Sequence, residues 1–223
     1  NAVQKELRLD RQPRHIECFD NSNLQGAHPV ASCVVFRDGK PARKEYRHFN
    51  IKTVEGPDDY ASMREVVFRR YSRLQEEGAE LPDLIIADGG KGQMGIIHEV
   101  LEYLGLDIPV AGLAKNDRHR TSELLCGYPP VLVGIRPTSP LFHFLAHIQE
   151  EVHRFAVSFH RQKRSKAFIH SELEQIEGIG DKTIRTLLQH FRSVAKVKAA
   201  PAEELSALVG PAKAKKIRAF FEK

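Results

Sequence analysis

Short apolar runs separated by polar turns predict β-strands near the start of the chain. The segments His15–Asp20 and Val30–Phe36 are dominated by apolar residues, and a third run extends from Arg43 to Ile51. The dipeptide Asp38-Gly39, between the second and third runs, favours a tight hairpin turn. The pattern therefore predicts three strands that are connected as hairpins.

From Asp59 onward, the spacing of the apolar residues changes to the helical period. Met63, Val67, Tyr71 and Leu74 keep helical spacing within a predicted helix over Asp59–Glu77. The pattern then predicts, in order, a strand over Leu84–Ala87, a helix from about Gln93 to Leu104, a strand over Pro109–Ala114, a β-hairpin over Thr121–Ile135 around Tyr128-Pro129-Pro130, and a helix from Ser139 to about His160. Helices and strands therefore alternate through this part of the chain.

The end of the chain contains an internal repeat. Leu173, Ile176 and Gly178 recur 32 residues later as Leu205, Leu208 and Gly210, which predicts two short helix-hairpin-helix units. Glycines at such a hairpin expose backbone N–H groups at a helix start, where a phosphate binds well. The candidate DNA-binding residues of the two hairpins are Gly178, Gly180, Lys182, Gly210 and Lys213. The second copy has Pro211 and Ala212 where the first has Ile179 and Gly180, so its hairpin could bind differently.

The order of the predicted elements indicates the fold class. Three hairpin-connected strands followed by alternating helices and strands are typical of an RNase H-like domain, whose active site gathers carboxylates from strand ends and helices. We therefore expect an α/β RNase H-like domain with a mixed sheet and flanking helices over residues 1–160. A basic linker is predicted over 161–170, on the run Arg161–Lys166, and a small all-α tandem helix-hairpin-helix domain over 171–223.

The charge is distributed unevenly along the chain. Residues 160–223 contain 14 Lys and Arg against 7 Asp and Glu, a net charge of +7, and the whole chain carries +5, which leaves −2 for residues 1–159. A weakly acidic body with a basic tail suits a nucleic-acid binder, although a solvated helical surface would have a similar composition.

Composition limits the class of protein. The chain has 223 residues and 41% hydrophobic residues, enough for a substantial core, and Asn1 indicates a fragment or a processed chain. No apolar run approaches the roughly 18 residues of a membrane helix, so no membrane partner is expected. Cys18, Cys33 and Cys126 lie in strand-like segments without metal-binding spacing, which favours reduced core thiols in a cytoplasmic protein.

The stretch "LIIADGGKGQ", residues 84–93, carries candidate chemistry. It is not a P-loop, because Gly92 follows Lys91 where that motif requires Ser or Thr. Asp88 follows a buried strand, at the edge where open α/β sheets place ligands. Lys91 lies near a predicted helix start and could bind a phosphate, or be an ordinary solvated lysine. The aspartate on its own could equally belong to a turn.

These segments resemble the C-terminal half of the UvrC family, the nuclease subunit of the bacterial excinuclease of nucleotide excision repair. The resemblance rests on "ECFDNSNLQG", "ASCVVF", "GPDDYASM", "IIADGGKGQ", "EVHRFAVSFHRQKRSK" and "LEQIEGIGDK", in this order. It implies an RNase H-like endonuclease that makes the incision on the 5′ side of a lesion in double-stranded DNA. The family's nuclease for the 3′ incision and its UvrB-binding segment lie outside this sequence, so a UvrB–DNA complex is expected only for the full-length protein.

The resemblance also implies the site residues. The family's catalytic aspartates correspond to Asp20 and Asp88, its catalytic histidine to His153, and a further aspartate to Asp59. Phosphodiester hydrolysis suits Mg²⁺ or Mn²⁺, which prefer oxygen ligands and activate water. Asp20 and Asp88 could share such an ion.

Two of these roles stay open at the level of sequence. His153 could bind a second metal ion, act as a general base or acid, or be an ordinary helix residue. Asp59 could support catalysis, or be only the N-terminal cap of its helix.

Two other functions compete with a DNA endonuclease. One is a DNA-binding protein whose nuclease fold is silent, which the intact set Asp20, Asp88 and His153 disfavours. The other is a different RNase H-like nuclease, and these enzymes usually rely on carboxylates alone, so His153 disfavours it too.

Overall fold

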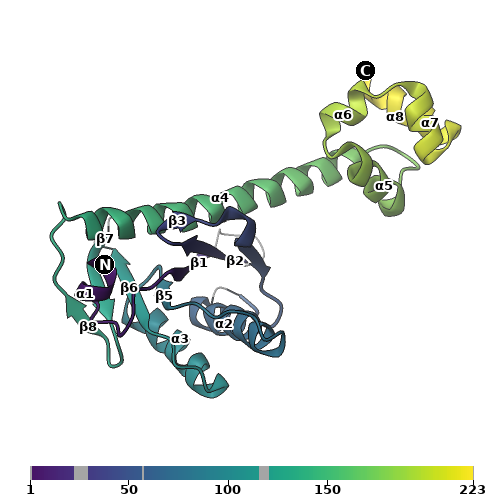
Figure 1. The fold of residues 1–223 in the computed structure, drawn as a ribbon. Helices are drawn as coiled ribbons and strands as arrows, with labels where there is room; N and C mark the ends of the chain where they lie inside the picture. The colour runs from purple at the N-terminus through teal and green to yellow at the C-terminus, as the bar shows by residue number, and fades with distance from the viewer. Residues whose placement is uncertain (1, 23–29, 57, 116–120, 223) are drawn as a thin grey trace. The chain divides into compact units, whose positions relative to one another are not determined.

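The computed structural model describes residues 2–22, 30–56, 58–115 and 121–222, without the side chains of residues 22, 115, 121, 122 and 160–171. The chain forms two compact units, Asn1–Phe159 and His160–Lys223 (Figure 1). None of the helices within the described ranges combines the length and the apolar character that a membrane span requires.

One mixed sheet organises the first unit. Within the described ranges it contains eight strands in the order β3-β2-β1-β5-β6-β7-β8, and β4 also pairs with β2. The strands are β1 (His15–Ser22), β2 (Val30–Arg37), β3 (Lys40–Pro41), β4 (Arg47–Asn50), β5 (Leu84–Ala87), β6 (Val110–Lys115), β7 (Thr121–Cys126) and β8 (Val131–Val133). The central pairs β1–β5 and β5–β6 are parallel, and the outer pairs are antiparallel.

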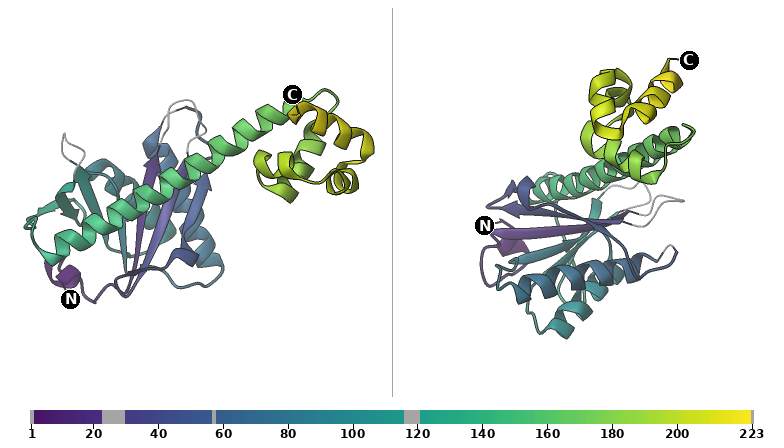
Figure 2. Two further views of the ribbon diagram at one scale, coloured as in Figure 1. Left: turned by 90° about the horizontal axis from the view of Figure 1, so that it is seen from above. Right: turned by 90° about the vertical axis from the view of Figure 1, so that its right-hand side faces the viewer.

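Helices cover both faces of this sheet. The helical segments are α1 (Ala2–Glu6), the 3-10 helix η1 (Arg43–Glu45), α2 (Asp59–Glu76), α3 (Lys91–Leu104), α4 (Pro140–Glu174), α5 (Asp181–Phe191), α6 (Val194–Ala199), α7 (Ala202–Val209) and α8 (Pro211–Phe221). Figure 2 shows α4, in green, along one face of the sheet and α2 and α3, in blue and teal, on the other. The expected α/β RNase H-like arrangement, with helices flanking a mixed sheet, is therefore confirmed.

Alternation along the central strands separates two hydrophobic cores. Ile16 and Cys18 of β1 belong to the core under α4, whereas Phe19 belongs to the core under α2 and α3. The helix predicted from Ser139 is present as α4, and its apolar residues Leu141, Leu145, Ile148 and Val152 lie in the core beneath it. Among the cysteines, Cys18 and Cys33 are buried, Cys126 is half-buried, and these three described residues are not joined in disulfides.

Two predicted boundaries are wrong. The strand expected over Arg43–Ile51 is shorter, because η1 occupies Arg43–Glu45 and β4 covers Arg47–Asn50; the two-residue β3 precedes it and pairs with the turn end of β2. Pro41 has no amide proton to donate and interrupts the ladder. The helix expected to end at about His160 instead continues to Glu174, so the segment 161–170 predicted as a linker lies within α4. No Gly or Pro stands between Pro140 and Gly178 to end the helix earlier.

The second unit has its own small core and contains the predicted repeat. Leu173 and Leu205 are fully buried in one hydrophobic cluster, and Leu208 packs against it. Gly178 and Gly210, the repeated glycines, have φ values of +83° and +87°. A side chain at either position would be strained, which explains why the repeat keeps glycine at both.

A buried ion pair connects β1 to α2 on the face opposite α4. The carboxylate of Glu17 is fully buried and accepts hydrogen bonds from Arg70 Nε at 2.6 Å, Tyr71 Oη at 2.8 Å and His15 Nε2 at 3.0 Å. Burial alone would raise the pKa of Glu17, but the hydrogen bonds from Arg70 and His15 outweigh it and lower that pKa to about 2. Glu17 therefore stays ionised inside the protein.

We expect Arg70→Met to lower the free energy of unfolding by about 3–5 kcal/mol, because it leaves a buried carboxylate without its cation. Arg73→Met is the matched control on the same helix, since Arg73 is exposed and forms its ion pair with Glu77, which is also exposed. Urea denaturation at neutral pH measures both variants. Equal losses of stability in the two would show that the pair with Glu17 contributes nothing special.

The same carboxylate gives the fold a defined acid sensitivity. Its folded pKa of about 2 lies below the ordinary 4.5, so its stabilising effect is complete above about pH 4.5 and is lost as the pH falls toward 2. Arg70→Met should flatten this part of the stability curve, and an unchanged slope would contradict the assignment to Glu17.

Candidate active site

Asp20 and Asp88 stand side by side at the carboxyl ends of two parallel strands. The β1–β5 register pairs Phe19 with Ala87, and the Asp88 amide donates to the Phe19 carbonyl at 2.9 Å. Asp20 and Asp88 are the next residues on their strands, and adjacent strands lie only about 4.8 Å apart. Alternation directs both side chains to the same face as Cys18, the face that α4 covers.

Helix α4 brings two polar side chains to this pair, four residues apart on one helical face. Gln149 Nε2 donates to Asp88 Oδ1 at 2.5 Å and lies 3.4 Å from the Leu113 carbonyl oxygen. His153 Nδ1 lies 3.8 Å from Asp20 Oδ2. The structure therefore brings the predicted residues Asp20, Asp88 and His153 together, and it adds Gln149, which the sequence reasoning missed.

The environment of Asp20 is suited to a cation. Asp20 is buried, and its Oδ2 atom has no hydrogen-bond partner within the described residues. His153 Nδ1, at 3.8 Å, is too far for a hydrogen bond, and its side chain is 62% exposed. Because a buried carboxylate oxygen without a partner is unfavourable, a bound cation would supply what the protein does not.

The ligands offered here are few and consist mainly of oxygen. In the part of the chain that the structure describes, no group of three or more His, Cys, Asp and Glu side chains is arranged to enclose a metal ion. A pair of carboxylates nevertheless fits a hard ion such as Mg²⁺, which commonly keeps several waters and takes one or two carboxylates from the protein. The residues present thus fit a partly hydrated divalent cation better than a fully enclosed one.

Asp59 begins α2 close to the aspartate pair. Asn21, the residue after Asp20, donates its side-chain amide to the Asp59 carbonyl at 2.7 Å. The alternative that Asp59 caps its helix is wrong, because Asp58 is the N-cap and accepts from the Ala61 amide at 2.9 Å. The cap explanation therefore no longer accounts for Asp59, whose side chain is exposed, and its catalytic role stays a prediction.

The loop after Asp88 turns sharply into α3. The helix begins at Lys91, two residues before the predicted start at Gln93, so exposed Lys91 lies in its first turn. Gly112 on β6 allows the loop to approach, since a Cβ there would lie 2.8 Å from the Gly89 carbonyl oxygen. Sequence reasoning missed Gly112, although a lone glycine inside a predicted strand is a signal of close backbone approach.

The predicted DNA-binding residues of the second unit gather around its two hairpins. Gly180 is the N-cap of α5, and exposed Lys182 lies in the first turn of that helix. Gly210 ends α7 and begins α8. Lys213 Nζ donates to Thr183 Oγ1 at 2.9 Å, so the second hairpin's lysine also connects the two repeats.

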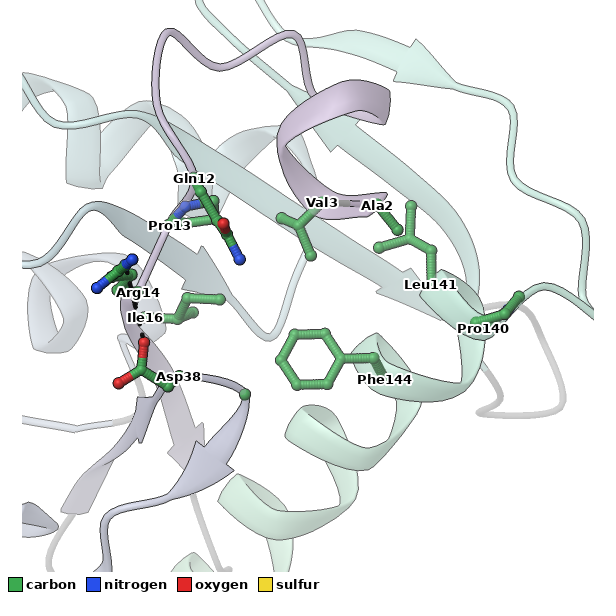
Figure 3. A pocket seen from close by; sticks show the side chains of 11 residues that line it. Ala2, Val3, Gln12, Pro13, Arg14, Ile16, Asp38, Pro140, Leu141 and Phe144 are labelled. Carbon is green, nitrogen blue, oxygen red and sulfur yellow. Dashed lines mark ion pairs between the residues drawn. The ribbon is translucent and has the colours of Figure 1, made fainter.

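Two cavities in the first unit contain none of the candidate site residues. The one in Figure 3, about 280 Å³, is lined by residues of α1, the start of α4 and the Asp38-Gly39 turn, at the opposite end of β1 from Asp20. The other, about 310 Å³, lies beside Arg70 and Glu17. The candidate site lies at the edge of the sheet where His153 is exposed.

Family models match both units. The UvrC RNAse H endonuclease domain matches residues 4–157, and the SAM-like helix-hairpin-helix tandem matches residues 171–223. Curated relatives are UvrABC system protein C from Bacteroides fragilis, 59% identical over 97% of this chain, and from Streptococcus uberis, 55% identical over 93%. The chain spans 36% and 35% of the length of those relatives.

Solved structures give a weaker comparison. Endonuclease V of Ciona intestinalis, in complex with an inosine-containing DNA, aligns with a TM-score of 0.37 and 15% identity over 54% of this chain and 60% of its own. The catalytic domain of human endonuclease V aligns with a TM-score of 0.32 and 13% identity over 55% of this chain and 68% of its own. Similarities at this level carry no argument for the site.

We expect Asp20→Asn to raise the free energy of unfolding by about 1–2 kcal/mol in EDTA, because it removes a buried charge whose Oδ2 atom has no hydrogen-bond partner among the described residues. Added Mn²⁺ should stabilise the wild type and erase this difference, since the cation binds the folded carboxylates. Asp38→Asn, an exposed carboxylate in the hairpin turn, should show neither effect. Thermal unfolding with and without Mn²⁺ measures all three proteins, and a destabilised Asp20→Asn in EDTA would contradict the argument.

Proposed function

Because this chain belongs to the UvrC family, we propose that its first unit hydrolyses a phosphodiester bond of DNA. The proposed reaction is the incision on the 5′ side of a lesion in double-stranded DNA, during bacterial nucleotide excision repair. The observation that supports it most strongly is the position of Asp20 and Asp88, each one residue beyond the Phe19–Ala87 pair, with His153 Nδ1 3.8 Å from Asp20 Oδ2.

The proposed cofactor is Mg²⁺ or Mn²⁺, held by Asp20 and Asp88. Such an ion, when bound, activates water and neutralises the charge of the phosphate undergoing substitution. Gln149 holds the Asp88 carboxylate in one orientation through its hydrogen bond of 2.5 Å. This restraint keeps the second ligand in place before the substrate arrives, in the way that outer hydrogen bonds orient metal ligands.

His153 has two possible tasks at this centre. Its imidazole could be a further ligand for a cation at Asp20, or it could accept a proton from the attacking water. Both tasks need the ring near Asp20 and open to the substrate, and the exposed position of His153 on α4 meets this need.

The second unit is proposed to hold the DNA duplex. Its hairpins offer backbone amides at Gly180 and a positive side chain at Lys182, a combination that binds backbone phosphates without reading the base sequence. Independence of sequence suits a repair nuclease, which meets lesions in any sequence. In the full-length protein, we propose that the partner is the complex of UvrB with damaged DNA, in the bacterial cytoplasm.

We expect Asp20→Asn and Asp88→Asn each to reduce the nicking of a lesion-bearing duplex in Mg²⁺ or Mn²⁺ by about a thousandfold or more, because each removes a ligand on which the transition state depends. Asp38→Asn is the control. Affinity for DNA in EDTA should stay near the wild-type value in all three. An RNA–DNA hybrid serves as the competing substrate, and nicking of the hybrid in preference to damaged DNA would argue for another RNase H-like activity.

Lys182→Ala should weaken DNA binding and reduce the slope of log Kd against log salt by about one, as expected when one phosphate contact and its released counterion are lost. Lys5→Ala, an exposed lysine in α1, should leave the slope unchanged. Fluorescence anisotropy across a salt series measures both. A slope that Lys182→Ala does not alter would remove the first hairpin from the proposed DNA surface.

A further inference from the structure

Tyr60 is an exposed aromatic residue beside the aspartate pair. It is the second residue of α2, and its side chain is 53% exposed. The preceding residue, Asp59, accepts a hydrogen bond from the Asn21 side chain at 2.7 Å, which ties the start of α2 to the strand end that carries Asp20. Tyr60 therefore lies at the same edge of the sheet as the proposed reaction.

The tip of the Tyr60 ring rests on Gly92. A Cβ atom at Gly92 would lie 2.4 Å from Tyr60 Oη and 2.8 Å from Cε1 and Cζ, so only glycine leaves room for the ring. Gly92 is the second residue of α3, four residues after Asp88. The ring thus connects the starts of α2 and α3. Helix α3 follows Asp88, and the start of α2 is hydrogen-bonded to Asn21, the residue after Asp20. Glycine is less favourable than alanine inside a helix, and the contact with Tyr60 explains why a glycine stands at position 92.

The other exposed aromatic residues of the described chain lie elsewhere. Tyr103 is near the end of α3, and Phe68 packs toward it with ring centroids 6.0 Å apart. Tyr128 stacks on His98 at 3.8 Å and follows β7 at the end where Cys126 pairs with Ala111, the opposite edge from Asp88. Of these aromatic residues, Tyr60 is the one adjacent to the candidate site.

We propose that Tyr60 is a DNA-binding residue whose ring stacks on a nucleotide of the DNA strand bound at Asp20 and Asp88. This inference rests on the proposed function. Stacking on an aromatic ring tolerates any base, which suits a nuclease that must act in every sequence context. The hydroxyl and the adjoining edge of the ring lie against Gly92, and the residue is 53% exposed, so we assign the contact with DNA to the remaining ring surface and not to the hydroxyl.

The first test compares substitutions at Tyr60. Tyr60→Ala should raise the Kd for a lesion-bearing duplex in EDTA, and the KM for nicking, about tenfold, with kcat within about twofold of wild type. Tyr60→Phe should retain wild-type values, because it keeps the ring. Tyr103→Ala, at a more exposed tyrosine on α3, is the control and should change nothing.

The second test moves the ring without altering it. Gly92→Ala places a methyl group where the Tyr60 hydroxyl lies, whereas Gly95→Ala, on the same helix, meets no atom within 4 Å. Both substitutions should leave the Tm equal or higher, since alanine favours a helix. Only Gly92→Ala should raise the Kd and KM as Tyr60→Ala does, and in a Tyr60→Ala background it should add nothing.

Specific outcomes would overturn the inference. Tyr60→Ala with wild-type Kd and KM would remove Tyr60 from the DNA surface. A loss in Tyr60→Phe as large as in Tyr60→Ala would assign the contact to the hydroxyl instead of the ring. Equal behaviour of Gly92→Ala and Gly95→Ala would show that the ring's placement is irrelevant. Failure of the wild type to nick DNA would contradict the proposed function alone, because the binding measurements in EDTA still test Tyr60.

Discussion

The parallel pairing of β1 with β5 is the constraint on which the candidate site depends. The register that sets Phe19 beside Ala87 also sets Asp20 beside Asp88, one residue beyond the paired region on each strand. A shift of one residue in either strand would turn its aspartate to the opposite face, away from α4. The buried side chains that hold this register are also those that align the two carboxylates.

The two faces of the sheet carry buried carboxylates with different roles. Even-numbered β1 residues face α4. There Asp20 lies near His153, and no described residue donates a hydrogen bond to Asp20 Oδ2. Odd-numbered residues face α2, where Glu17 is saturated by Arg70, Tyr71 and His15. Both carboxylates are buried, yet one is fully satisfied by the protein and the other is not. That difference suits Glu17 to a structural role and Asp20 to binding an external cation.

Much of the fold could be predicted from the sequence, because its signals are local. The apolar run Leu84–Ala87, the repeat around Gly178 and Gly210, and the stripe of α4 each follow from periodicity or turn chemistry. The errors arose where distant contacts decide. Gln149 looked like any polar helix residue until the fold brought it to Asp88, and the cap role considered for Asp59 belongs to Asp58, the residue before it. The family resemblance, and not periodicity, indicated His153.

A crystal structure of the chain after a Mn²⁺ soak, with anomalous diffraction to locate the ion, tests this metal site directly. If Asp20 and Asp88 share a cation, a Mn²⁺ peak lies within about 2 Å of one carboxylate oxygen from each of them. Gln149 should still hold the other side of the Asp88 carboxylate. Ion peaks elsewhere with none between the two aspartates, or none in the crystal at all, would contradict the claim that the β1–β5 register builds a metal site.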